Sequence, residues 1–94
     1  MFDVRVGEDG LVHLVGRLDA AEAENASRAF EALHRSTTFD CGELEYISSA
    51  GIEVLIRTYK RLNAAGQSFK LVRLIPRVRN VFMYAGLDRI LTIE

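Results

Sequence analysis

The sequence predicts an α/β domain in which a mixed sheet of four or five strands packs with three or more helices. Two strand-like segments joined by a short glycine turn begin the chain. After them, helix-like and strand-like segments alternate, which indicates mostly parallel strands joined by right-handed crossovers. Hydrophobic residues make up 49% of the 94 residues. This composition suits one compact core, so we expect a single domain over residues 1–94.

An antiparallel hairpin is predicted at the N-terminus. Residues 2–6 alternate between apolar and charged, with the period of two of a half-buried strand. Residues 11–15 are almost all apolar, as in a more central strand. The turn residues 7–10 between them are too few for a crossover. His13 interrupts the second strand, and no second metal ligand lies near it in the sequence.

Three helices are predicted from apolar spacings of three and four residues. Asp19 and Glu22 have the spacing of a capping box, which predicts a helix over about 20–34. The longest helix is expected over about 49–65, ending at Gly66. A third helix begins at Pro76. The face of the longest helix expected to lie on the sheet consists of Ile52, Leu55, Ile56, Tyr59 and Leu62.

The remaining strands are shorter. Residues 37–41 form the least regular one, and Gly42 is expected to separate it from residues 44–47. Residues 69–74 and 90–93 complete the sheet. Cys41, the only cysteine, is expected to be a small core residue that forms no disulfide.

The charge balance excludes some classes of function. Twelve basic and thirteen acidic residues give a net charge of −1, whereas nucleic-acid binding needs a basic excess or patch. No apolar run is long enough to cross a membrane, and the N-terminus lacks the regions of a signal peptide. We therefore expect a cytoplasmic protein that neither binds nucleic acid nor inserts into a membrane.

Catalytic signatures are also absent. Histidines and carboxylates do not cluster with the spacing of a metal site. The chain has no Gly-x-Ser-x-Gly elbow and no glycine-rich phosphate loop with a lysine. We therefore expect no enzyme, no metal and no cofactor.

Two adjacent serines stand where a predicted strand gives way to the longest helix. Ser48 is placed to cap that helix by accepting hydrogen bonds from its first amide groups. One interpretation ends there, with a cap and nothing more. In the other, Ser49 is a phosphorylation site, because a helix N-terminus accommodates the added negative charge.

A partner-binding surface is predicted around these serines. It comprises Ile47, Ser48, Ser49, Ala50 and Val54, with acidic residues Glu43, Glu45 and Glu53 nearby. Val54 lies outside the apolar stripe, one turn after Ala50. It is either a scattered surface valine or part of the binding patch.

Four segments, in order, resemble the STAS domain family of sulphate transporters and anti-sigma factor antagonists. They are residues 16–19 (Gly-Arg-Leu-Asp), residues 44–51 (Leu-Glu-Tyr-Ile-Ser-Ser-Ala-Gly), residues 57–62 with Gly66, and residues 76–87. The second is the most specific, and the similarity is greatest to the small free-standing bacterial antagonists. The resemblance implies a STAS-like sheet–helix fold.

It also implies a regulatory cycle. An antagonist of this type binds an anti-sigma factor that is also a serine kinase, and the sigma factor is released. The kinase uses ATP to phosphorylate the antagonist, at the position of Ser49 here, and a serine phosphatase resets it.

The family pattern leaves alternatives. Such antagonists often have Asp immediately before the acceptor, whereas this chain has Ser48, which becomes a second candidate acceptor. Other STAS proteins are never phosphorylated and serve as scaffold components or as the small subunit of lipid-transport assemblies.

Overall fold

A computed structural model describes all residues 1–94 and contains one five-stranded sheet. The strands are β1 (Phe2–Val6), β2 (Val12–Leu18), β3 (Thr37–Ile47), β4 (Phe69–Val72) and β5 (Thr92–Ile93), in the spatial order β1-β2-β3-β4-β5. β1 is antiparallel to β2, and every later pair is parallel. The predicted N-terminal hairpin and the parallel pairing after it are confirmed.

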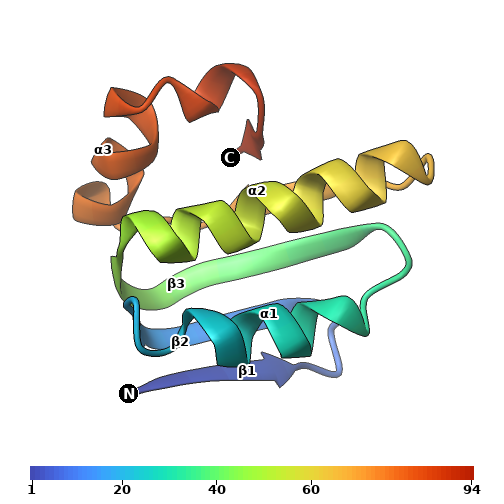
Figure 1. The fold of residues 1–94 in the computed structure, drawn as a ribbon, viewed down its shortest axis with the longest axis horizontal. Helices are drawn as coiled ribbons and strands as arrows, with labels where there is room; N and C mark the ends of the chain where they lie inside the picture. The colour runs from blue at the N-terminus through green and yellow to red at the C-terminus, as the bar shows by residue number, and fades with distance from the viewer.

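The helices are α1 (Ala23–Glu31), α2 (Ser49–Ala64) and α3 (Pro76–Tyr84), followed by a short 3-10 helix, η1 (Leu87–Arg89). α1 and α2 run side by side over β2 and β3, and α3 lies beside the start of α2 (Figure 1). All three helices contribute side chains to one core against the sheet. No helix is long and apolar enough to span a membrane.

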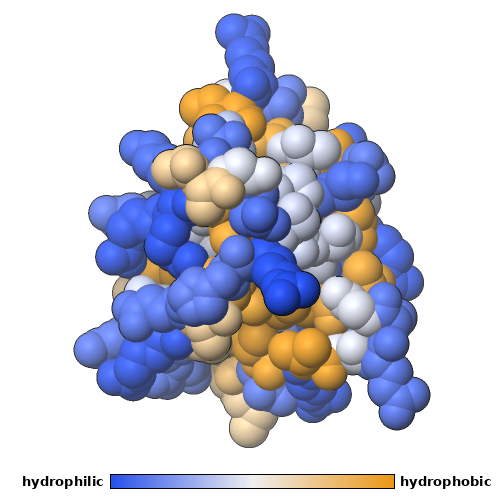
Figure 2. Space-filling view, turned by 90° about the vertical axis from the view of Figure 1, so that its right-hand side faces the viewer, coloured by the Kyte–Doolittle hydropathy of each residue, from blue (hydrophilic) through white to orange (hydrophobic).

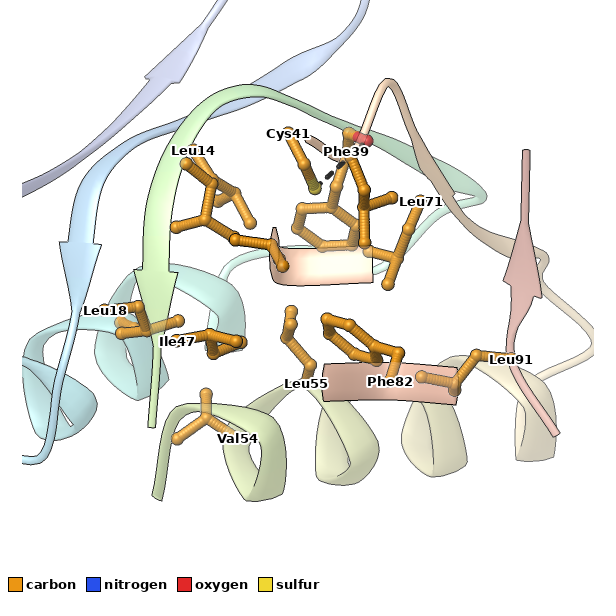
Figure 3. Packing of buried hydrophobic residues seen from close by; sticks show 14 of the residues in the cluster. Leu14, Leu18, Phe39, Cys41, Ile47, Val54, Leu55, Leu71, Phe82 and Leu91 are labelled. Carbon is orange, nitrogen blue, oxygen red and sulfur yellow. Dashed lines mark hydrogen bonds between the residues drawn. The ribbon is translucent and has the colours of Figure 1, made fainter. Parts of the chain in front are cut away.

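The core is a single cluster of buried apolar side chains (Figure 3). The strands contribute Leu14, Phe39 and Leu71, each with an exposed fraction of 0%. Leu55 of α2 and Phe82 of α3 meet them from the helical side. Burying such side chains removes apolar area from water, which is the main favourable contribution to folding.

β3 is a single strand of eleven residues, so the prediction that Gly42 ends a strand is wrong. Gly42 lies inside this strand and leaves room for the guanidinium group of Arg73. A Cβ at this position would lie 2.6 Å from Arg73 Nη2. Here the missing side chain permits a tertiary contact and does not break the strand.

α1 is shorter than predicted. Asp19 Oδ1 accepts a hydrogen bond from the Glu22 amide at 3.1 Å, but this bond caps a turn that precedes the helix. At the other end, Arg61 of α2 donates to the carbonyls of Phe30 and Leu33, both at 2.7 Å. This long-range capping lets α1 end before the predicted position.

The buried stripe of α2 is displaced from the predicted one. Its members are Gly51, Val54, Leu55, Thr58 and Leu62, while Ile52, Ile56 and Tyr59 are only partly buried at its flank. Gly51 and Thr58 concealed this stripe because neither is apolar in character. Thr58 is accommodated in the core because its hydroxyl donates to the Val54 carbonyl at 2.9 Å.

The predicted helix boundaries elsewhere are confirmed. α2 begins at Ser49, and Gly66 follows it with a φ of 75°. Pro76 is the first residue of α3, where its missing amide costs no hydrogen bond. The predicted final strand is reduced to Thr92–Ile93 because the amides of Ile90 and Leu91 donate instead to the Leu87 carbonyl of η1, at 3.0 and 2.8 Å.

Candidate functional site

The junction between β3 and α2 is fixed by hydrogen bonds around Ser48. Its amide donates to the Leu18 carbonyl of β2 at 2.9 Å, and its Oγ accepts from the Gly51 amide at 3.1 Å. Ser48 is the N-cap of α2, as the sequence predicted. The two bonds hold the first turn of α2 against the ends of two strands.

Gly51 is required by the closeness of that contact. A Cβ at Gly51 would lie 2.7 Å from Leu18 Cγ, 2.8 Å from the Leu18 carbonyl oxygen and 3.0 Å from Ile47 Cγ1. Because backbone atoms cannot move aside as a flexible side chain can, any larger residue would push α2 away from the sheet. Gly51 therefore sets the position of Ser49.

Ser49 is the first residue of α2, and its side chain is exposed. Ser48 and Ala50 on either side are half-buried. The residue predicted to accept phosphate is thus accessible, at the positive end of a sixteen-residue helix. Its phosphorylation remains a prediction.

Two residues of the predicted binding surface are buried in the core. Ile47 and Val54 have exposed fractions of 4% and 3%, and both face the sheet–helix interior (Figure 3). The prediction that Val54 lies on the surface is wrong because the buried stripe of α2 includes it. The large apolar side chains that remain partly accessible on this helix are Ile52, Ile56 and Tyr59, of which Ile52 and Ile56 are nearer to Ser49 in the sequence.

Two arginines lie beside the last residues of β3, and no pattern in the sequence indicates their placement. Arg77 of α3 donates to the Glu45 carbonyl at 3.0 and 3.2 Å. The Arg17 guanidinium carbon lies 4.4 Å from the centre of the Tyr46 ring. Glu43, Glu45 and Glu53 are exposed, as expected for an acidic surface. The end of β3 therefore carries both signs of charge.

A polar network occupies the face of the sheet away from the helices. Both carboxylate oxygens of Asp40 accept from Arg73 Nε at 3.0 Å, and Oδ1 also accepts from the Gly42 amide at 2.9 Å. His13 lies between Asp40 and Asp9, at 3.8 and 3.3 Å from their carboxylates. Burial opposes ionisation of Asp40, but these hydrogen bonds and charges outweigh it and lower its pKa.

The lone cysteine of the chain, Cys41, is a free thiol in the core. Cys41 is buried, and burial raises its pKa to about 12, so its thiol stays protonated at neutral pH. No group of three or more histidine, cysteine or acidic residues is arranged to hold a metal ion.

A family model described as "Mlab, STAS domain" matches residues 1–92, nearly the whole chain. The chain belongs to the STAS domain family. Residues 44–51, the segment with the most specific resemblance to this family, form the end of β3 and the start of α2.

A protein of Bordetella bronchiseptica, provisionally named the anti-sigma factor antagonist BtrV, is 35% identical over 77 residues. The match covers 78% of this chain and 66% of that protein, just under two thirds of its length.

Solved structures share the fold. A protein from Thermotoga maritima, provisionally described as an anti-sigma factor antagonist, superposes with a TM-score of 0.81 at 24% identity, covering 99% of this chain and 85% of that one. The phosphorylated form of the Bacillus cell fate determinant SpoIIAA gives a TM-score of 0.70 at 19% identity, covering 100% and 91%.

Proposed function

We propose that this chain is an anti-sigma factor antagonist whose binding to an anti-sigma factor is controlled by phosphorylation of Ser49. The observation that supports this most directly is the position of Ser49, an exposed hydroxyl at the start of a rigidly held helix. Its neighbour Ser48 is already engaged as the cap. Membership of the STAS family and the name of the Bordetella relative support the choice of partner.

In the proposed cycle, the anti-sigma factor is also a serine kinase. It binds the unmodified antagonist and releases its sigma factor. The γ-phosphoryl group of ATP then passes to Ser49 Oγ, ADP leaves, and the modified antagonist dissociates. A serine phosphatase removes the phosphate and restores binding.

The docking surface would follow the exposed side of α2. Ser49 and Glu53 are exposed, and helical spacing places the half-buried Ile52 and Ile56 beside them. These two isoleucines take the role that the sequence assigned to Val54. The phosphate adds about −1.5 to −2 charges next to this apolar surface, and a partner would have to desolvate them to stay bound.

The fold tolerates the modified state in this proposal. The first amides of a helix and its dipole favour an anion, so a phosphate on Ser49 need not unfold α2. The effect then falls on binding and not on stability. A regulator that works in this way needs no catalytic group of its own.

The test uses wild type, Ser49→Ala and Ser48→Ala with the anti-sigma kinase identified by pull-down and mass spectrometry. We expect Ser49→Ala to bind the kinase, to accept no phosphate and to stay bound when ATP is added. Ser48→Ala should accept phosphate but lose about 0.5–2 kcal/mol of stability with its cap. Phosphate found on Ser48 and not on Ser49 would make Ser48 the regulated residue.

The second candidate function is a STAS interaction module that is never phosphorylated. It is favoured by Ser48 standing where such antagonists often have Asp, which weakens the match to the kinase substrate. Wild-type protein that binds its partner but gains no phosphate with kinase and ATP would select this candidate. A Ser49→Glu variant that binds as well as wild type would agree with that result.

A further inference from the structure

β1 is an edge strand, and the direction of its hydrogen bonds shows which groups are unused. The Arg17 amide donates to the Met1 carbonyl at 2.8 Å, and the Gly7 amide donates to the Leu11 carbonyl at 2.9 Å. Backbone hydrogen-bonding groups alternate in direction along an antiparallel pair, so the amides and carbonyls of the odd-numbered residues of β1 point toward β2. The amides and carbonyls of Phe2, Val4 and Val6 therefore point away from the sheet.

Apolar surface accompanies this free edge. Val6 has an exposed fraction of 75%, although Phe2 and Val4 on the same side of the strand pack against the core. A hollow of about 210 Å³ lies next to the edge, and it is lined by Phe2, Asp3, Val4, Asn25 and Ala29. Figure 2, which views the molecule from the right-hand side of Figure 1, shows a group of hydrophobic atoms in the lower half of that face.

The other side of the strand carries one charge of each sign. Asp3 and Arg5 are exposed, with 2.9 Å between Asp3 Oδ2 and Arg5 Nε. Oδ1 of Asp3 accepts from the Val4 amide at 3.0 Å, which partly satisfies one of the outward-facing groups. Charges on an edge strand normally prevent pairing with another chain, unless the incoming strand matches them.

We propose that β1 pairs with β1 of a second copy of this chain, antiparallel and related by a two-fold axis at Val4. In this register Val4 lies opposite Val4, Phe2 opposite Val6, and Asp3 opposite Arg5. All backbone groups in the outward-facing pairs then find partners. Two copies form one continuous sheet with an isologous interface, in which the same surface is used twice.

The charges select this register among the alternatives. Sliding the second strand by two residues in one direction places Asp3 opposite Asp3, and in the other direction Arg5 opposite Arg5. Like charges directly opposite on neighbouring strands are destabilising, whereas opposite charges are favourable. Only the register centred on Val4 places each acid opposite a base.

The pairing also accounts for the exposed groups. Asp3 exchanges its bond with the Val4 amide for the arginine of the second copy, so that amide becomes free to donate to the opposite Val4 carbonyl. Val6 comes to lie against Phe2 and beside the hollow at the edge. Asp3 and Arg5 fall at a non-hydrogen-bonded pair, where side chains on the two strands are closest.

The test measures oligomeric state by sedimentation equilibrium and light scattering. We expect wild type to form a dimer in a concentration-dependent way. In the Asp3→Arg dimer two arginines lie opposite each other at both charge pairs, and in the Arg5→Asp dimer two aspartates do. Each variant alone should therefore dimerise about tenfold more weakly or worse. Both side chains are more than half exposed, so neither change disturbs the core. Circular dichroism and thermal melting verify the fold.

Mixing the two variants is the decisive step. One chain then presents two basic residues and the other two acidic residues, so the heterodimer has two opposite-charge pairs and should form at least as well as wild type. Asp88→Arg, which changes charge outside the sheet, is the matched control and should leave wild-type dimerisation unchanged. A wild-type monomer at all concentrations would overturn the proposal. A dimer whose dissociation constant is the same in wild type and in both variants would also overturn it. That result would point to an interface at the exposed Met83, Tyr84 and Ile90 instead.

Discussion

The helix-covered face of the sheet presents Leu14, Phe39 and Leu71, whereas the opposite face of the same strands presents His13, Asp40 and Lys70. The first set packs into one apolar cluster. On the second face, Asp40 depends on specific partners, chiefly Arg73 and the Gly42 amide. Apolar packing has no required direction, but a buried carboxylate is stable only when its few hydrogen bonds are all present. The two faces should therefore respond differently to substitution.

The largest expected effect comes from truncating the covered face. Leu14→Ala should lower the free energy of unfolding by about 2–5 kcal/mol, because Leu14 is fully buried. Val15→Ala is the matched control, since Val15 is the next residue of β2. It is only half-buried and lies on the face of the sheet away from the helices, the open face. This substitution should cost less than half as much. Urea unfolding followed by circular dichroism measures both, and equal losses would contradict the contrast between the faces.

The next effect tests the open face through pH. Asp40→Asn should cost about 1.5–3 kcal/mol at neutral pH, because it removes a charged hydrogen-bond acceptor that is 5% exposed. The pKa of Asp40 is lowered in the folded protein. Its contribution is therefore complete above the unfolded pKa of about 3.9 and is lost as the pH falls through the folded value.

Unfolding measured at pH 7 and at successively lower pH should show the wild type and Asp40→Asn converging in acid. A difference that stays constant below pH 4 would show that the carboxylate charge is unimportant. Glu94→Gln, at an exposed ion pair with Lys70, is the control and should change little at any pH.

The contrast between the faces also explains what the sequence could predict. The hairpin, the parallel order, the Ser48 cap and the start of α2 depend on local spacing, which a sequence displays directly. The Asp40–Arg73 pair joins residues 33 positions apart and depends on Gly42 having no side chain. No local pattern reports such a pair. The burial of Val54 was missed for a related reason, since Gly51 and Thr58 disguise the stripe to which it belongs.

A smaller effect on stability comes from the backbone conformation of Arg73, which has a φ of 61°. Residues with a Cβ are disfavoured in this left-handed region by about 1 kcal/mol or more, and glycine is not. Arg73→Ala and Arg73→Gly both lose the bond to Asp40, but only glycine removes the steric strain of the positive φ. We therefore expect the glycine variant to be about 1 kcal/mol more stable than the alanine variant in urea. Equal stabilities would show that the loop relaxes once the ion pair is lost.

The smallest effect concerns Arg17 and Tyr46, which meet on the open face with the guanidinium 4.4 Å from the ring centre. An exposed cation–π contact contributes about 0.5–1 kcal/mol, because water solvates the cation nearly as well as the ring does. Single substitutions to alanine also remove other contacts, so the coupling comes from a double-mutant cycle on Arg17→Ala and Tyr46→Ala. We expect a coupling near 0.5 kcal/mol in urea unfolding. Arg17→Lys should retain part of it, since the charge remains but the planar stacking group is lost. A coupling comparable to the cost of Asp40→Asn would mean that the open face is held by its surface contacts as strongly as by its buried acid.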